Sequence, residues 1–75
     1  MKIRYDTETD TLTLTLRDLP VRESVEERSG VILDYATDGM LTGLEILDAS
    51  RRVTRPTSVE LEVVPAPAVP RAAAE

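Results

Sequence analysis

The chain has 75 residues, a net charge of −5 and neither cysteine nor histidine. This length supports one small domain, and the missing residue types exclude disulfide cross-links and the common structural zinc sites. The acidic balance argues against a general nucleic-acid-binding protein, which needs a broad positive surface.

The N-terminal part of the chain predicts a β-hairpin. Apolar and polar residues alternate over 1–6 and again over 11–17, the pattern of strands with one buried face. The turn between them has alternating acids at Asp6, Glu8 and Asp10. An EF-hand loop that began at Asp6 would also need Gly at its sixth position and Glu at its twelfth, where this chain has Thr11 and Arg17. A solvated turn is therefore predicted rather than a calcium site.

The middle of the chain predicts three further strands, over 21–28, 31–36 and 40–47. The first is polar and suits an exposed edge. The other two form a hairpin around Asp38-Gly39, a strong turn signal. Both have apolar residues in both alternation phases, which predicts that this hairpin is covered on both faces. Gly43 stands where the apolar phase changes, which indicates a β-bulge.

The C-terminal part predicts a short helix near 49–55. Asp48 and Ser50 are good N-cap residues, and Pro56 ends the helix. Residues 58–64 alternate again and predict either a last strand or an amphipathic arm, folded onto the same sheet or exchanged with another subunit. A Pro/Ala-rich, mobile tail is expected over 65–75.

These elements predict a mainly β fold, a β-rich α+β domain over residues 1–64. We expect a small antiparallel meander of five or six strands with one short helix near 49–55. Short connections favour pairing of the strands in sequence order.

Several blocks of the chain resemble the bacterial family known as domain of unknown function 2283. The resemblance covers about residues 1–52. It rests on the opening MKIRYD with its acidic turn and apolar second strand, on GVILDY at 30–35, on Asp38-Gly39 and on GLEILDAS at 43–50. It implies a small β-rich bacterial domain without established catalytic residues, and an antitoxin-like role beside a partner protein. The chain departs from the family pattern after Arg52.

The sequence offers little for catalysis. Without histidine, no serine can belong to a Ser-His-acid triad, and the three glycines form no phosphate-binding loop. We therefore expect a non-enzymatic protein without a cofactor. The alternative is a metal- or ligand-binding domain or a small enzyme that uses Asp34, Glu45 and Asp48, because paired carboxylates in a half-buried site raise a pKa or hold a cation.

The small core predicts association. The chain has no Phe or Trp, and a domain of this size buries only a modest part of its surface. We expect a homo-oligomer, with a dimer as the first expectation and a protein partner as a further one. The predicted interface residues are Ile32, Met40, Leu44, Ile46, Val59, Leu61 and Val63. The chain has no signal-peptide core and no apolar run long enough to span a membrane, so a cytoplasmic location without nucleic acid or membrane partners is expected.

Overall fold

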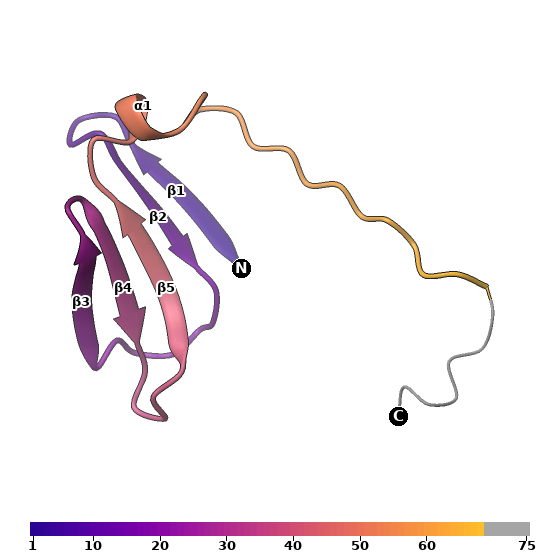
Figure 1. The fold of residues 1–75 in the computed structure, drawn as a ribbon, viewed down its shortest axis with the longest axis horizontal. Helices are drawn as coiled ribbons and strands as arrows, with labels where there is room; N and C mark the ends of the chain where they lie inside the picture. Colours follow the sequence, from indigo (N-terminus) through magenta and orange to yellow (C-terminus); the bar gives the residue numbers. More distant parts are fainter. Residues whose placement is uncertain (69–75) are drawn as a thin grey trace.

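The computed structural model describes residues 1–68, which form one open antiparallel sheet and one short helix (Figure 1). The elements in chain order are β1 (Lys2–Asp6), β2 (Thr11–Thr15), β3 (Glu23–Arg28), β4 (Val31–Tyr35), β5 (Leu41–Ile46) and α1 (Ala49–Arg52). The predicted fold class is confirmed: the protein is mainly β, with five antiparallel strands and a single short helix.

Local sequence explains the first hairpin. β1 and β2 pair in an unbroken register from Lys2 opposite Thr15 to Asp6 opposite Thr11. In the turn, the Asp6 carboxylate accepts hydrogen bonds from the backbone N–H groups of Glu8 (2.9 Å) and Thr9 (3.3 Å). An acidic side chain that bonds the backbone two or three residues ahead stabilises such a turn.

The hairpin around Asp38-Gly39 also forms as predicted. The Ala36 N–H donates to the Met40 carbonyl (2.9 Å), and the Gly39 N–H donates back to the Ala36 carbonyl (2.9 Å). Gly39 has φ 83°, the left-handed conformation that ends a three-residue hairpin loop. The Asp38 carboxylate accepts the Met40 N–H at 3.0 Å.

The order of strands in the sheet is β1-β2-β5-β4-β3, so pairing in sequence order fails at one place. β2 pairs with β5 and not with β3, and the connection over residues 16–22 passes the ends of β5 and β4 to reach the far edge (Figure 1). Burial explains this order, because β5 offers Leu44 and Ile46 beside Leu14 and Leu12. β3 carries mostly charged residues and lies at the solvent-exposed edge.

The predicted bulge lies beside Gly43. Asp34 opposes Gly43, whereas Tyr35 opposes Leu41, so Thr42 is the extra residue on β5. A bulge shifts the alternation by one position. It therefore brings Leu41 to the same face as Leu44. A second register shift in β3 leaves Glu27 as its extra residue.

The shifted alternation separates an apolar face of the sheet from a polar face, because directly opposed residues of antiparallel strands point to the same side. The apolar face has an aliphatic row that crosses all five strands and a second row beside it. The aliphatic row is Ile3, Leu14, Leu44, Leu33 and Val25, and the second row is Tyr5, Leu12, Ile46 and Val31. The expectation of apolar cover on both faces of the hairpin is corrected, because its other face carries Asp34 and Glu45 beside Ile32.

The segment after β5 leaves the sheet. α1 is shorter than predicted, and the chain then runs outward as an extended arm (Figure 1). Residues 58–64 form no strand within the described part of the chain, so the sheet itself has five strands. Of the predicted tail over 65–75, residues 69–75 lie outside the described part. No helix of residues 1–68 is long and apolar enough to cross a membrane.

Candidate functional site

The polar face of the sheet is built from two rows of opposed residues. These rows are Lys2, Thr15, Gly43, Asp34 and Ser24, and Arg4, Thr13, Glu45, Ile32 and Glu26. The β1 end of both rows is basic, and the β5, β4 and β3 end is acidic. A hollow of about 360 Å³ lies over β1, β2 and the end of β5, with Arg4, Thr13 and Glu45 in its lining.

A carboxyl pair forms the chemical centre of this face. Asp34 is only 5% exposed, and its Oδ1 accepts a hydrogen bond from the Ser24 hydroxyl at 2.6 Å. The hydrogen bond that Glu45 shares with Asp34 raises the pKa of Glu45, and burial and the charge of Asp34 raise it further. A carboxyl group whose pKa is raised by a neighbouring carboxylate is suited to proton exchange, and a pair of carboxyl groups is suited to binding a cationic group.

Gly43 lies between the backbone of β2 and Asp34. A Cβ atom at position 43 would lie 2.8 Å from the backbone oxygen of Leu14 and 3.6 Å from Oδ2 of Asp34. The missing side chain therefore lets the backbone of β2 lie close against β5 at Gly43.

Asp48 does not join the pair. It is exposed, has φ 53°, and makes no side-chain hydrogen bond to α1. Its predicted role as an N-cap is therefore corrected. Among residues 1–68, no group of three or more acidic side chains is placed to hold a metal ion. The structure thus brings together Asp34 and Glu45 but not the three predicted carboxylates.

Asp10 caps α1 instead, from 40 residues earlier in the chain. Its carboxylate accepts hydrogen bonds from the Ser50 backbone N–H (3.0 Å), the Ser50 hydroxyl (2.7 Å) and the Tyr5 hydroxyl (2.6 Å). The hydrogen bond from Tyr5 and those from Ser50 lower the pKa of Asp10, and the same bond raises the pKa of Tyr5. Sequence reasoning missed this role, since nothing local relates Asp10 to Ser50.

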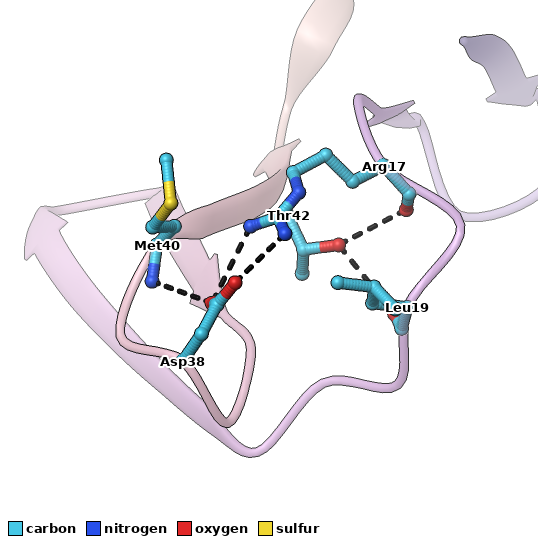
Figure 2. A network of polar contacts seen from close by, with 5 residues as sticks. All are labelled: Arg17, Leu19, Asp38, Met40 and Thr42. Atoms are coloured by element: carbon cyan, nitrogen blue, oxygen red, sulfur yellow. Dashed lines mark hydrogen bonds and ion pairs between the residues drawn. The ribbon is translucent and has the colours of Figure 1, made fainter.

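A second polar network fixes the connection between β2 and β3 (Figure 2). The guanidinium of Arg17 donates to both oxygens of Asp38, at 2.8 and 3.4 Å, and this contact lowers the pKa of Asp38. The hydroxyl of the bulge residue Thr42 donates to the backbone oxygens of Arg17 (3.0 Å) and Leu19 (3.4 Å). The network holds the connection against the β4–β5 turn and is structural.

The predicted interface residues are divided among four places. Leu44 and Ile46 lie on the apolar face, and Ile32 lies on the polar face. Met40 is exposed beside the β4–β5 turn. The remaining three belong to the exposed arm: Val59, Leu61 and Val63.

Comparison with known families matches residues 2–50 to the one described as "Protein of unknown function (DUF2283)". No curated protein and no solved structure matches the chain. The matched segment contains the whole sheet, the carboxyl pair and Asp10, and it ends at Ser50.

Proposed function

Since the chain belongs to the DUF2283 family of proteins of unknown function, we propose a function from its geometry: a non-enzymatic interaction module that associates with a second copy of itself. The observation that carries the proposal is the uncovered apolar face of the sheet.

The aliphatic row supports this proposal. Five side chains from five strands lie side by side, of which Ile3 is exposed and the other four are half-buried. Within residues 1–68, the buried hydrophobic residues are only Leu12, Ala36 and Ala49. No second layer of residues 1–68 covers this face (Figure 1). Contiguous exposed apolar surface is typical of an interaction site, and face-to-face packing of two sheets buries such a surface.

Two neighbouring residues of β2 provide the test. Leu14 points to the apolar face and Thr13 to the polar face. We expect Leu14→Lys to convert a dimer into a monomer, because a charge would be buried in the centre of the interface. Thr13→Lys adds the same charge on the other face and should leave the dimer intact.

Size-exclusion chromatography with light scattering gives the oligomeric state of each chain, and circular dichroism shows whether each variant is folded. If the unmodified chain is a monomer at micromolar concentrations, self-association is refuted, and the apolar face is then left for a different protein partner.

The carboxyl pair favours a second function, the binding of a cationic ligand on the polar face. Glu45 lines the hollow, and Asp34 lies on the same face and raises the pKa of Glu45. A ligand that binds only the folded protein must raise its melting temperature. A panel of divalent cations and small amines should therefore raise the melting temperature of the native chain but not that of Glu45→Gln. Equal responses from both proteins would exclude this site.

A further inference from the structure

We propose that the arm formed by residues 58–64 adds as a sixth strand to the free edge of β1 in a second copy of the chain. The inference rests on the proposed self-association and specifies one of its contacts.

The arm has the composition of a half-buried strand. Val59, Leu61 and Val63 alternate with Glu60 and Glu62. The three apolar side chains are 60%, 79% and 76% exposed, so within its own molecule the arm buries little. Seven extended residues span about 23 Å, and the five residues of β1 span about 17 Å, so the arm is long enough to cover the whole edge strand.

β1 is the receptive edge of the sheet. It has a neighbour on one side only, and its pairing with β2 is regular along its whole length. Lys2 and Arg4 point to the polar face, whereas Ile3 and Tyr5 point to the apolar face. In the described part of the chain, neither Lys2 nor Arg4 forms an ion pair.

The alternation of the arm matches the alternation of this edge. An added strand that places Val59, Leu61 and Val63 on the apolar face places Glu60 and Glu62 on the polar face. There they lie beside Lys2 and Arg4. Opposite charges on neighbouring strands stabilise the pairing, and the apolar residues extend the apolar face by one strand. Backbone hydrogen bonds to an exposed edge supply the remaining affinity.

The other edge of the sheet is unsuitable. β3 carries Glu26 on the polar face, where it would lie beside the glutamates of the arm. The register shift at Glu27 also interrupts its regular hydrogen bonding. A bulge on an edge strand, together with a charge of the same sign as that of the incoming strand, opposes the addition of a further strand.

The arm is directed away from its own sheet. The Ser58 N–H donates to the Arg55 carbonyl at 3.0 Å, which closes a turn with Pro56 at a position where proline is favoured. Beyond this turn the arm extends outward from the molecule (Figure 1). The radius of gyration is 15.9 Å, against about 11 Å for a compact chain of this length. A second copy is therefore the favoured acceptor.

The cysteine-free chain allows a direct test by disulfide trapping. One preparation carries Arg4→Cys, and a second, with a different affinity tag, carries Glu60→Cys or Glu62→Cys. Neighbouring strands place such residues within disulfide distance. After mild oxidation of the mixture we expect a mixed disulfide between the two tags. The matched control is Glu26→Cys, which offers a cysteine on the same face of the β3 edge and should not be trapped.

Three outcomes would overturn the inference: no mixed disulfide for either arm position, trapping at Glu26→Cys equal to that at Arg4→Cys, or a double variant Arg4→Cys/Glu60→Cys that closes only within one chain. Charge reversal gives an independent test. Glu60→Lys/Glu62→Lys should weaken the dimer about tenfold, and Lys2→Glu/Arg4→Glu in the same chain should restore it.

The two proposals fail in different ways. A dimer that is disrupted by Leu14→Lys but is not trapped between the arm and β1 refutes the strand addition alone. A monomeric chain that is unaffected by Leu14→Lys refutes the self-association.

Discussion

At the scale of single residues, Gly43 controls how closely β2 approaches β5. Replacement by Ala places a Cβ atom 2.8 Å from a backbone oxygen, which cannot move without a shift of β2. We expect Gly43→Ala to lower the free energy of unfolding by about 1–3 kcal/mol, measured by urea denaturation.

Gly39 provides the comparison for that measurement. Its added Cβ would meet no atom within 4 Å, although φ is 83°. Asn adopts this conformation readily, so Gly39→Asn should cost less than about 1 kcal/mol. Equal losses for both variants would contradict the close approach at Gly43.

Glu45 makes the folded protein less stable as the pH rises. A carboxylate paired with a cation has the opposite effect, because its pKa is lowered on folding. Its pKa is raised above 4.5 in the folded chain, so the folded state holds this proton more tightly than the unfolded state. The stabilisation is complete below the unfolded pKa and is lost as the pH rises through the folded pKa. Since the amide of Gln donates to Asp34 at every pH, Glu45→Gln should gain stability relative to the native chain between pH 4 and 7.

Thermal unfolding across this pH range measures the difference. Glu8→Gln removes the same charge from the exposed β1–β2 turn and serves as the control. A difference between Glu45→Gln and the native chain that stays constant with pH would show that the pKa of Glu45 is not raised in the folded chain.

At the scale of elements, α1 is attached to the sheet by Asp10. The pKa of Asp10 is lowered from 3.8 by its bonds to Tyr5 and Ser50, so its contribution to stability is present above that value and is lost as the pH falls through the lowered pKa. We expect Asp10→Asn to show a smaller loss of stability than the native chain between pH 5 and 2, and faster exchange of the Ser50 amide hydrogen at pH 6.

Asp48→Asn is the matched control for α1. Asp48 occupies the N-cap position but makes no side-chain hydrogen bond there, so this variant should exchange the Ser50 amide as slowly as the native chain. Faster exchange in Asp48→Asn than in Asp10→Asn would reverse the assignment of the cap.

Thr42 holds a second element, the connection between β2 and β3. Its side chain is 2% exposed, and Thr42→Val removes the donor to the carbonyls of Arg17 and Leu19 without changing the shape of the residue. We expect a loss of about 1–2 kcal/mol in the free energy of unfolding, measured by urea denaturation. Thr42→Ser retains the hydroxyl and should therefore keep most of the free energy of unfolding that Thr42→Val loses.

The sequence predicts well those elements that neighbouring residues determine. Alternation and turn residues place both hairpins, and the phase change at Gly43 indicates the bulge. The pairing of β2 with β5 was not predicted, because it depends on which apolar strands are buried together and not on chain order. The capping of α1 by Asp10 was also not predicted, because it too depends on a contact between distant parts of the chain. It joins residues 40 positions apart, and no local pattern marks them.

The candidate site was predicted in part for the same reason. Asp34 and Glu45 stand out as acids within apolar strands, and the sheet brings them together. Asp48 lies two residues beyond the end of β5, with a left-handed backbone, and is exposed there rather than placed with the pair. Two predicted interface residues, Ile32 and Leu44, lie on opposite faces of the sheet. The extra residue Thr42 shifts the alternation of β5 by one position, and the sequence does not fix where in the strand this shift occurs.

At the scale of the whole molecule, a chain with so few buried hydrophobic residues should owe much of its stability to association. Because a dimer is stabilised by mass action, the melting temperature should rise with protein concentration. Calorimetry over a hundredfold range of concentration measures this dependence. Leu14→Lys should remove it, and a melting temperature that is independent of concentration in the native chain would indicate a self-sufficient monomer.

The pairing of β2 with β5 also determines the order in which the protein can be completed during synthesis. The hairpins β1–β2 and β4–β5 each form from neighbouring residues, but the central pair joins Leu12 to Ile46 across most of the sheet sequence. Closing so long a loop is slow compared with forming a turn. The first hairpin must therefore wait on the ribosome, with its leucines exposed, until β5 has emerged.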